Sequence, residues 1–471
     1  MALKIFNTMS RKKEVFKPIH GKKVNMFVCG PTVYDYSHLG HAKTYVQFDI
    51  IVRYLRFKGF DIFYLMNITD LDDKIIKRAK GNDETPKSLA RRFEKEYYKD
   101  MKALGINSVD KYARATDFIK AIIKQVKALL DKGYAYKIED GIYYDLSKFK
   151  DYGKLSRRTT LEAEDAVSRI DESVKKRNKG DFCLWKKSKP DEPKWDSPWF
   201  KGRPGWHIED TAITESHFGP QYDIHGGARD LIFPHHEAEI AQMEAISGKK
   251  PFVKYWLHTG FLTVEGRKMA KSLGNFVTIS DALKKHDTET VRLFFASTHY
   301  RSPIDFSQKN LEQSKKSLDR LYTTLENVQF MKTTDKVTPQ EKQFEMRLQS
   351  YKEKFITAMD DDFNTREALK VVFKISNETN KFISRRKEFN VDVKDNILKI
   401  FKELGGIFGI LQKEIKKEQL SDEIKKLIDD REVARKRKDW KKADAIRAEL
   451  KKMGIILEDT PEGVKWKVKK K

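Results

Sequence analysis

Two short apolar runs separated by a helical pattern stand near the start of the chain. Residues 24–28 have the length and β-propensity of a buried strand, and residues 60–68 have the same character. Between the two runs apolar residues recur at helical spacing, and Gly59 follows where a helix would end. The pattern predicts a strand–helix–strand unit, in which ligands bind beyond the carboxyl ends of the strands. The apolar positions of the helix are Tyr45, Phe48, Ile51, Val52 and Leu55.

Polar side chains with useful chemistry follow both strands. Cys29-Gly30-Pro31 forms a turn signal at the end of the first strand, and Thr69-Asp70 follows the second. His38, Gly40 and His41 stand at the helix start, where free N–H groups and the helix dipole favour a phosphate. Two histidines alone would be ordinary surface residues, but the glycine between them lets a phosphate or a flat ligand approach the backbone. We therefore expect a ligand site at this helix start.

The middle of the chain predicts further strands and helices with an interruption. Residues 134–144 predict a β-hairpin with Asp140-Gly141 at its turn. Residues 145–200 are rich in Lys, Pro, Ser and Trp, show little periodicity, and are expected to form an irregular insertion between two halves of a sheet. The elements expected after the insertion are a strand and turn at residues 222–227, a helix at 234–240 that ends near Gly248, a strand at 253–258 and a basic loop at 266–275.

The C-terminal third has a different pattern. Beyond residue 305 the apolar spacing predicts long helices that continue to about residue 415. The last fifty residues predict two basic helices, 421–436 and 440–453, followed by a strand, a turn at residues 460–463 and a second strand. We expect this tail to be a small folded module.

Composition narrows the class of protein. The chain has 471 residues, and 95 Lys and Arg against 70 Asp and Glu give a net charge of +25. This excess favours a polyanionic partner, nucleic acid first and an anionic membrane second, although lysine is spread over the whole chain. The two cysteines exclude a disulfide framework. Since the start lacks a signal peptide and no apolar run approaches the ~20 residues of a membrane span, we expect a soluble cytoplasmic protein.

The basic loop carries the second piece of candidate chemistry. Lys268 and Lys271 lie three residues apart between Gly266 and Gly274, and lysines on such a hinged loop can neutralise a phosphate chain. Taken alone, this pattern is typical of a solvated basic turn. Taken with the histidine pair, it resembles the class I aminoacyl-tRNA synthetases: His38-Leu39-Gly40-His41 is similar to their HIGH signature, and Lys268-Met269-Ala270-Lys271-Ser272 to their KMSKS signature. Leu39 and Ala270 are conservative departures from the two patterns.

Further motifs resemble the cysteinyl-tRNA synthetase family over nearly the whole chain and in the family's order. These motifs are Cys29 before Pro31-Thr32-Val33-Tyr34-Asp35, Asn67-Ile68-Thr69-Asp70, Gly205-Trp206-His207-Ile208-Glu209, Asp223-Ile224-His225-Gly226-Gly227, Phe233-Pro234-His235-His236-Glu237, Asp360-Asp361-Asp362-Phe363-Asn364-Thr365 and Asp439-Trp440.

The pattern and the resemblance together predict an α/β fold class: a Rossmann-type parallel sheet in a catalytic domain with an insertion, then a helical bundle and a small C-terminal α/β module. The expected boundaries are 1–130 for the first half of the catalytic domain, 131–210 for the connective insertion, 211–260 for the second half, 261–305 for the KMSKS-loop and stem-contact region, 306–414 for the helical bundle and 415–471 for an anticodon-binding module.

The resemblance also implies a reaction. It is the activation of L-cysteine with ATP and Mg²⁺ to cysteinyl-adenylate, with release of pyrophosphate and transfer of cysteine to the 3′ end of tRNA(Cys), by a monomer. The substrate carboxylate is itself the nucleophile, so positioning and cationic stabilisation carry the catalysis. His38 and His41 are expected at the ATP phosphates and Gly40 beside the nucleotide, while Lys268 and Lys271 hold the departing pyrophosphate.

Selection of cysteine over serine implies a metal, because zinc binds a thiolate far better than a hydroxyl. The family holds zinc with two Cys, one His and one Glu, and Cys29, His235 and Glu239 match three of these ligands. Asp210 stands at the fourth position, and its carboxylate keeps the negative charge and can ligate zinc. We expect a retained zinc ion; the competing hypothesis is a lost metal, with Asp210 hydrogen-bonded to the amino acid or a neighbour. The family also places four residues around the bound cysteine: Cys29, Thr69, Trp206 and Asp230.

The C-terminal module carries candidate tRNA-binding residues, and two other functions stay open. Arg435, Trp440 and Asp444 match positions that the family uses for the anticodon, since an indole can stack on a base and Arg and Asp can read its edge. The alternative for Trp440 is a core residue of the small module. A synthetase-like ligase that joins cysteine to an amino-sugar stays open, although such relatives lack a tRNA-reading C-terminal domain. A non-catalytic RNA-binding relative stays open too, although both signatures keep their histidines and lysines.

Overall fold

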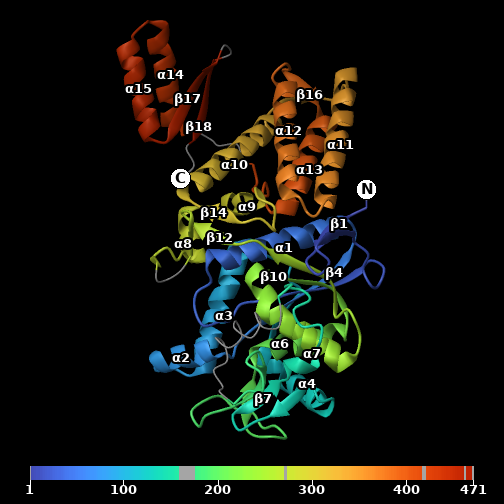
Figure 1. Ribbon diagram of the computed structural model, residues 1–471. Coiled ribbons are helices and arrows are strands. Elements are labelled where there is room, and N and C mark those ends of the chain that lie inside the picture. The colour runs from blue at the N-terminus through green and yellow to red at the C-terminus, as the bar shows by residue number, and fades with distance from the viewer. Residues whose placement is uncertain (1, 159–174, 270–272, 416–420, 461–462, 469–471) are drawn as a thin grey trace. The chain divides into compact units, whose positions relative to one another are not determined.

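The computed structural model describes residues 2–158, 175–269, 273–415, 421–460 and 463–468, and it divides into two compact units (Figure 1). The first unit spans Met1–Lys413 and the second spans Glu414–Lys471. Ala270, Lys271 and Ser272 of the predicted KMSKS signature lie outside the described residues. Among the residues described, the model contains no helix long and apolar enough to cross a membrane.

A parallel sheet forms the centre of the first unit. Its strand order is β11-β10-β3-β4-β5, and every neighbouring pair is parallel. From β3 the chain moves outward through β4 and β5, and β10 and β11 then continue on the opposite side of β3. The order therefore reverses between β3 and β10, which is where open α/β sheets bind their ligands. The strands are β3 Lys23–Val28, β4 Asp61–Ile68, β5 Lys111–Arg114, β10 Tyr222–Ala228 and β11 Val253–Thr259.

Helices cover both faces of this sheet. On one face, side chains of the strands pack with those of α4 Ile119–Asp131, α6 Trp206–Phe218 and α7 Glu237–Ser247 in one core. The other face carries α1 Leu39–Phe57, which contacts β4, β10 and β11. These elements confirm the predicted α/β class and its strand–helix–strand start. Gly59, with a φ of +83°, follows α1 as expected for a helix C-terminus.

The Gly226-Gly227 pair corrects one expectation. We expected a turn there, but both glycines lie inside β10. A Cβ on Gly226 would stand 2.5 Å from the ring of Phe48 on α1, so the glycine allows the helix to approach the strand. The demand for glycine therefore comes from packing rather than from a turn.

The insertion is more regular than expected. β6 Ala135–Lys137 and β7 Gly141–Tyr144 confirm the predicted hairpin. Two later strands, β8 Phe182–Lys187 and β9 Gly202–Pro204, extend it to an antiparallel sheet of order β6-β7-β8-β9. The expectation of an irregular segment was wrong for residues 182–187. Strands this short are stabilised by pairing with a partner distant in sequence, which leaves little local periodicity.

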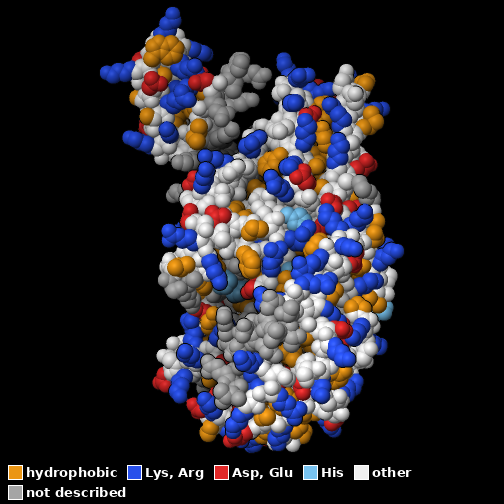
Figure 2. Space-filling view, in the orientation of Figure 1, with side chains coloured by type: hydrophobic (Ala, Val, Ile, Leu, Met, Phe, Trp, Pro, Cys, Tyr) orange, Lys and Arg blue, Asp and Glu red, His pale blue; other side chains and the backbone are white. Residues whose placement is uncertain are grey.

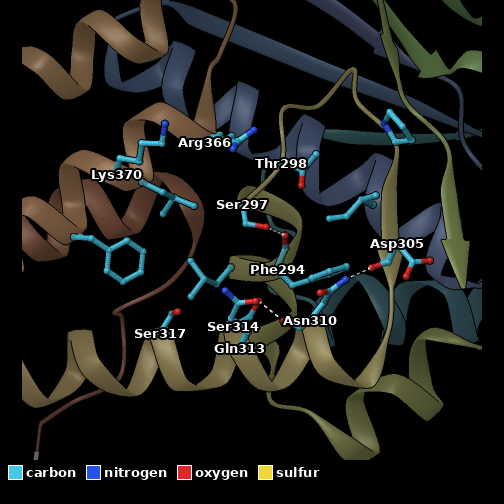
Figure 3. Close-up of a pocket in the computed structure, with 15 residues that line it drawn as sticks. Phe294, Ser297, Thr298, Asp305, Asn310, Gln313, Ser314, Ser317, Arg366 and Lys370 are labelled. Atoms are coloured by element: carbon cyan, nitrogen blue, oxygen red, sulfur yellow. Dashed lines mark hydrogen bonds between the residues drawn. The ribbon is translucent and has the colours of Figure 1, made fainter. Parts of the chain in front are cut away.

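Long helices follow the parallel sheet, as predicted. Among them a cavity of about 470 Å³ lies between α9 Thr288–Ala296, α10 Gln308–Gln329 and α12 Thr365–Ile383, beside β14 Ile304–Phe306 (Figure 3). The remaining elements of the first unit are β1 Lys4–Asn7, β2 Lys12–Val15, α2 Asp73–Gly81, α3 Pro86–Ala103, β12 Leu262–Val264, β13 Arg267–Lys268, α8 Ile279–Lys285, β15 Lys332–Thr334, α11 Pro339–Asp360, β16 Glu388–Asn390 and α13 Val391–Phe408.

The second unit is a small α/β module with its own core. Two helices, α14 Asp422–Lys436 and α15 Trp440–Lys452, precede an antiparallel pair formed by β17 Ile455–Thr460 and β18 Gly463–Val468. The apolar side chains buried together are Ile428, Ile446, Leu450, Ile455 and Leu457. This module confirms the small C-terminal α/β element of the predicted fold class.

The surface charge is dispersed. On the face shown in Figure 2, Lys and Arg side chains are scattered among Asp and Glu. The excess of positive charge therefore favours a polyanionic partner, but the distribution of charge on this face does not indicate where that partner binds.

Candidate active site

The two signature histidines build the start of α1. The His41 backbone N–H donates to His38 Nδ1 at 3.4 Å, and the His38 backbone N–H donates to His41 Nδ1 at 3.5 Å. The two residues therefore form a reciprocal capping box at the N-terminus of α1. Their rings stack with centroids 3.8 Å apart. Burial first, and then the neighbouring His38, lowers the pKa of His41 well below its usual value. The site therefore presents a neutral His41 imidazole beside a helix N-terminus.

The segment that follows the lysine loop lies against this helix start. The Leu39 N–H donates to the carbonyl of Val277 at 3.1 Å, and the Ile279 N–H donates to the carbonyl of Ser37 at 3.0 Å. The ring of Phe276 contacts that of His38 edge-on at 5.5 Å. The tertiary structure thus brings together two segments that are more than two hundred residues apart in the sequence.

Of the two lysines of the predicted signature, Lys268 lies within the described residues. Lys268 is exposed in β13, and its carbonyl accepts a hydrogen bond from Asn275 at 3.0 Å. Met269 lies 3.7 Å from the position that a Cβ on Gly40 would take. Lys271 lies outside the described residues, so its role stays a prediction.

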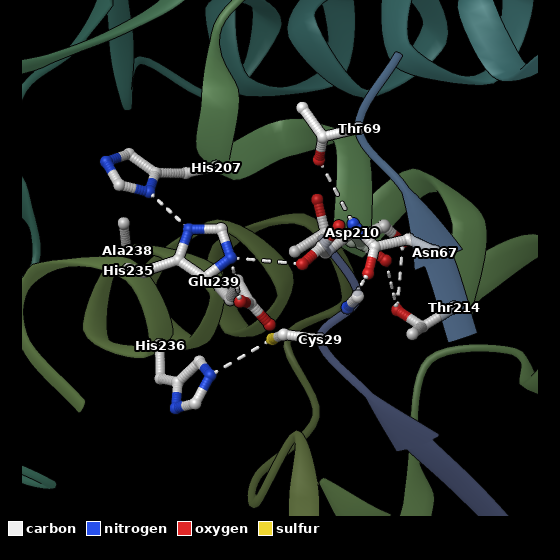
Figure 4. A network of polar contacts seen from close by, with 12 residues as sticks. Cys29, Asn67, Thr69, His207, Asp210, Thr214, His235, His236, Ala238 and Glu239 are labelled. Carbon is white, nitrogen blue, oxygen red and sulfur yellow. Dashed lines mark hydrogen bonds and ion pairs between the residues drawn. The ribbon is translucent and has the colours of Figure 1, made fainter. Parts of the chain in front are cut away.

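Four side chains from separate segments converge beyond the end of β3 (Figure 4). His235 Nε2 lies 3.0 Å from Asp210 Oδ2 and 3.1 Å from Glu239 Oε1. The ligand atoms of Cys29, Asp210, His235 and Glu239 all lie within 4.8 Å of one another, and all four residues are buried. We call this set the outer quartet. It contains the four ligands predicted from the sequence, including Asp210.

His235 reaches this set by an unexpected route. The sequence predicted a helix from residue 234, but α7 begins at Glu237. The chain before it makes a wide turn, Ile232–His236, in which Phe233 is extended with φ −135° and ψ 130°. Phe233 precedes Pro234, and a residue before proline is disfavoured in the helical region. The helix therefore starts later than the apolar pattern suggested.

The electrostatics of the outer quartet favour a cation. Burial, with smaller contributions from Asp210 and Glu239, raises the pKa of the Cys29 thiol well above its usual value. Burial and Asp210 raise the pKa of Glu239 in the same way. Both carboxylate oxygens of Glu239 are buried, and their close contacts with His235 and His225 lack the geometry of a hydrogen bond. A divalent cation would satisfy these oxygens and stabilise the thiolate, so the donor set fits a zinc ion.

Two further histidines belong to the same cluster, and the sequence analysis gave them no role. His225 Nε2 lies 3.3 Å and His236 Nε2 3.2 Å from the Cys29 sulfur. Together with Cys29 and Glu239 they form a second possible metal-binding group, the inner quartet. The available signal was that both histidines stand in the matched motifs, and His225 lies in β10, the strand next to β3. Burial lowers the pKa of both histidines well below their usual values, so both rings are neutral.

A cavity of about 540 Å³ lies beside the outer quartet and is lined by Trp206, Glu209 and Asp230 among others. The indole ring of Trp206 stacks on His235 with centroids 4.3 Å apart, which connects the cavity to the quartet. Thr69 is buried next to this region and accepts a hydrogen bond from Asn67 at 3.3 Å. Glu209, another residue without a predicted role, is buried with one carboxylate oxygen unpartnered.

The predicted anticodon residues lie in the C-terminal module. Trp440 begins α15 and is 58% exposed, so the alternative of a core tryptophan was wrong. Asp444 is exposed one turn further along the helix. Arg435 lies on α14 and donates to Asp459 at 2.5 Å, so this arginine already has a carboxylate partner. An exposed indole beside basic helices can stack on an unpaired base.

Three family models match successive parts of the chain. The model of the tRNA synthetases class I (C) catalytic domain matches residues 15–316. A DALR domain matches residues 354–412, and the cysteinyl-tRNA ligase anticodon binding domain matches residues 417–466. The chain belongs to the cysteine–tRNA ligase family. The resemblance predicted from the sequence motifs is therefore confirmed.

Relatives in this family match the chain from end to end. A cysteine–tRNA ligase of Thermococcus gammatolerans is 49% identical and covers 99% of both chains. One of Thermodesulfovibrio yellowstonii is 45% identical and covers 99% of this chain and 100% of its own length. Methionyl-tRNA synthetase of Mycobacterium tuberculosis, solved in complex with methionyl-adenylate, shares the fold at 16% identity, with a TM-score of 0.63 over 82% of this chain and 93% of its own.

Proposed function

We propose that this chain attaches cysteine to tRNA in two steps. The cysteine carboxylate attacks the α-phosphorus of ATP, a phosphorus–oxygen bond forms, and pyrophosphate leaves. A ribose hydroxyl at the 3′ end of tRNA(Cys) then attacks the activated carbonyl, loses its proton and displaces AMP. The observation that carries the proposal is the outer quartet, which adjoins a cavity through the Trp206–His235 stack. The anticodon-binding match favours tRNA over an amino-sugar as the acceptor.

In the first step, the groups around the start of α1 act on the phosphates. His38 and His41 would donate hydrogen bonds to the ATP phosphates, and the N-terminal N–H groups of α1 add positive potential there. Gly40 keeps the backbone accessible, because a Cβ at this position would stand 2.9 Å from the His38 ring. Lys268 and Lys271 would neutralise the departing pyrophosphate, whose charge Mg²⁺ shares.

The cavity and the outer quartet would together select cysteine over serine. Trp206 and Asp230 line the cavity and would orient the amino acid, with Asp230 as a counter-charge for its ammonium group. Thr69, buried next to Asn67, would add a hydroxyl contact. Cys29, Asp210, His235 and Glu239 would hold one zinc ion, which supplies a Lewis-acid centre that prefers a thiolate to a hydroxyl. His207 would orient the ligand ring, because its Nδ1 lies 2.8 Å from His235 Nδ1.

Zinc content and ATP–pyrophosphate exchange test this selection. The protein purified without chelator should contain one zinc per chain and exchange pyrophosphate with cysteine but not with serine. Chelation should abolish the exchange, and added zinc should restore it. Asp210→Cys is the matched variant, because it converts the outer quartet to two thiolates and should resist chelation better than the parent. Full cysteine activation by zinc-free protein, unmoved by added zinc, would rule out the metal.

The phosphate residues are tested by the same assay with paired variants. His41→Ala and Lys268→Ala should each lower the rate of adenylate formation by ~10²–10³-fold, as for other transition-state contacts. Lys284→Ala, at an exposed lysine of α8 paired with Asp281, is the control and should leave the rate unchanged. Normal cysteinyl-adenylate formation by both test variants would disprove the placement of the phosphates.

The C-terminal module would bind the anticodon of the tRNA. Arg435, Trp440 and Asp444 would contact the anticodon, with Arg435 exchanging its partner Asp459 for a base or a phosphate. We propose a cytoplasmic monomer, since the anticodon module and the catalytic unit are both supplied by one chain. Sedimentation of the free protein and of its tRNA complex would check that state, and a dimer would contradict it.

A further inference from the structure

A buried carboxylate in the wall of the cavity lacks a partner for one of its oxygens. Glu209 lines the cavity beside the outer quartet, is 1% exposed, and has one carboxylate oxygen without a hydrogen-bond partner. We infer that Glu209 binds the α-ammonium group of the amino acid together with Asp230. The inference rests on the proposed function, which places the amino acid in this cavity, and it adds a substrate-binding residue to that function.

The helix α6 directs two consecutive carboxylates to different places. Trp206 and Glu209 stand three residues apart, so they lie on one side of the helix, and both line the cavity. Asp210 is the next residue, and its Oδ2 lies 3.0 Å from His235 Nε2 in the outer quartet. Consecutive side chains of a helix point about 100° apart. Glu209 is therefore free to serve the cavity while Asp210 serves the quartet.

A chain of hydrogen bonds holds the Glu209 carboxylate in place. The Gly30 N–H donates to Asn67 Oδ1 at 2.5 Å, and Asn67 Nδ2 donates to Thr69 Oγ1 at 3.3 Å. The Thr69 hydroxyl in turn hydrogen-bonds to Glu209. Because this hydroxyl accepts from Asn67, its own proton is available for the carboxylate. The segments after β3 and β4 thus position Glu209, and one of its oxygens is left for a ligand.

The protein itself does not neutralise this carboxylate. Within the described part of the chain, no Lys or Arg pairs with Glu209. Lys186 and Arg203 also line the cavity, but both form ion pairs with Asp73. Three further carboxylates act on Glu209 with the same sign of charge: Asp210, Asp70 and Asp72. Because a buried and unpaired charge is costly, the site favours a ligand that brings a positive charge.

An α-ammonium group supplies both the charge and the hydrogen-bond donors that are missing. It carries three N–H donors, so it can bond to the unpartnered oxygen of Glu209 and to Asp230 at the same time. Asp230 is exposed whereas Glu209 is buried, and a buried charge contact is less screened by water. Glu209 also repels a carboxylate, so it would determine which end of the amino acid enters this part of the cavity.

Glu209→Gln in the full-length protein tests this inference. Glutamine keeps the shape of the side chain and removes its charge, so the fold should be retained. In ATP–pyrophosphate exchange, the KM for cysteine should rise about 10–100-fold, the range expected for one charge-assisted hydrogen bond. The kcat should stay near the parent value, because the contact is made equally in the ground state and the transition state. A parent-like KM in Glu209→Gln would overturn the inference.

An inhibitor without the ammonium group separates binding from a merely structural role. The compound 3-mercaptopropionate keeps the thiol and the carboxylate of cysteine but lacks the amino group. Its inhibition constant should stay unchanged or fall in Glu209→Gln, because it makes no bond to the charge that the substitution removes. Equal weakening of cysteine and 3-mercaptopropionate would mean that Glu209 only maintains the shape of the site, and this result would overturn the inference.

Two more variants complete the test. Glu215→Gln makes the same substitution on α6 outside the cavity, at a residue that accepts from Gln125, and should keep the parent KM. Asp230→Asn separates the inference from the proposed function. If Asp230→Asn raises the KM for cysteine and Glu209→Gln does not, the inference fails while the proposed function stands. If the parent protein shows no exchange with cysteine, the proposed function fails as well.

Discussion

Replacing Arg292 by methionine should destabilise the catalytic unit strongly. Arg292 on α9 is 1% exposed, and it donates to Asp49 on α1 at 2.5 Å, to the carbonyl of Phe408 at 2.7 Å and to that of Leu104 at 3.0 Å. Burial would raise the pKa of Asp49, but Arg292 and Arg53 outweigh burial and hold that pKa below its usual value. The substitution therefore leaves a buried carboxylate with a single arginine and two carbonyls without donors.

The expected cost follows from these contacts. Removing one partner of a buried ion pair costs about 3–5 kcal/mol, and each buried acceptor left unpaired costs about 1–3 kcal/mol. Arg53 limits the total, because its Nε stays 2.7 Å from Asp49, and methionine refills part of the volume. We expect a loss of about 3–5 kcal/mol in the free energy of unfolding, a large share of the ~5–15 kcal/mol typical of a folded protein.

Guanidinium unfolding followed by tryptophan fluorescence measures this loss. Lys284→Met is the control: it makes a similar change at an exposed pair with Asp281 and should cost less than about 1 kcal/mol. Arg292→Met combined with Asp49→Asn should recover part of the loss, since the buried charge is then removed. If Arg292→Met unfolds at the same guanidinium concentration as Lys284→Met, the buried ion pair does not stabilise the unit as argued.

Three further predictions concern the strand ends, the C-terminal module and pH. Gly30→Ala should prevent folding of the catalytic unit, because its Cβ would stand 1.8 Å from the carbonyl oxygen of Asn67; soluble expression with a parent-like circular dichroism spectrum would contradict this. Trp440→Ala should raise the KM for tRNA about 10-fold or more, since base stacking is worth ~1–3 kcal/mol, and should leave ATP–pyrophosphate exchange unchanged. An equal rise in this KM for Val433→Ala, at another exposed residue of the module, would argue against stacking. Burial, with Glu96 adding to it, raises the pKa of Asp100 to about 6, so the folded state binds this proton more tightly than the unfolded state. The contribution of this group to the free energy of unfolding therefore rises as the pH falls from about 6 toward the unfolded pKa of ~3.9. Asp100→Asn should stabilise the protein at pH 8 relative to the parent and lose that advantage near pH 4. A difference in unfolding free energy that does not change with pH would refute this prediction.

Local signals predicted much of the fold. The apolar run before Cys29, the turn at Gly30-Pro31 and the helix that ends before Gly59 follow from propensity and spacing. The prediction failed where a neighbour distant in sequence overrides the local signal. Gly226 lies in a strand because Phe48 needs the space, and residues 182–187 form a strand because β7 pairs with them.

The candidate site was likewise predictable from the sequence only in part. The resemblance predicted the histidine pair, the lysine loop and Cys29, His235 and Glu239 of the outer quartet, because these residues match the family's motifs, and it predicted Asp210 from its place at the fourth ligand position. The spacing could not reveal that His225 and His236 face the same sulfur as the predicted ligands. It also could not reveal that His38 and His41 cap their own helix, which depends on the ring orientations.

The sequence by itself determined the order of elements, the family and the residue types available for the chemistry. Only the tertiary structure decided which of them meet. Cys29 follows β3, His225 lies in β10 and Glu239 lies in α7, and they converge because the sheet order places β10 beside β3 at the point where the topology reverses. Local propensity acts over a few residues, whereas these contacts span about two hundred and depend on the packing of both sheet faces.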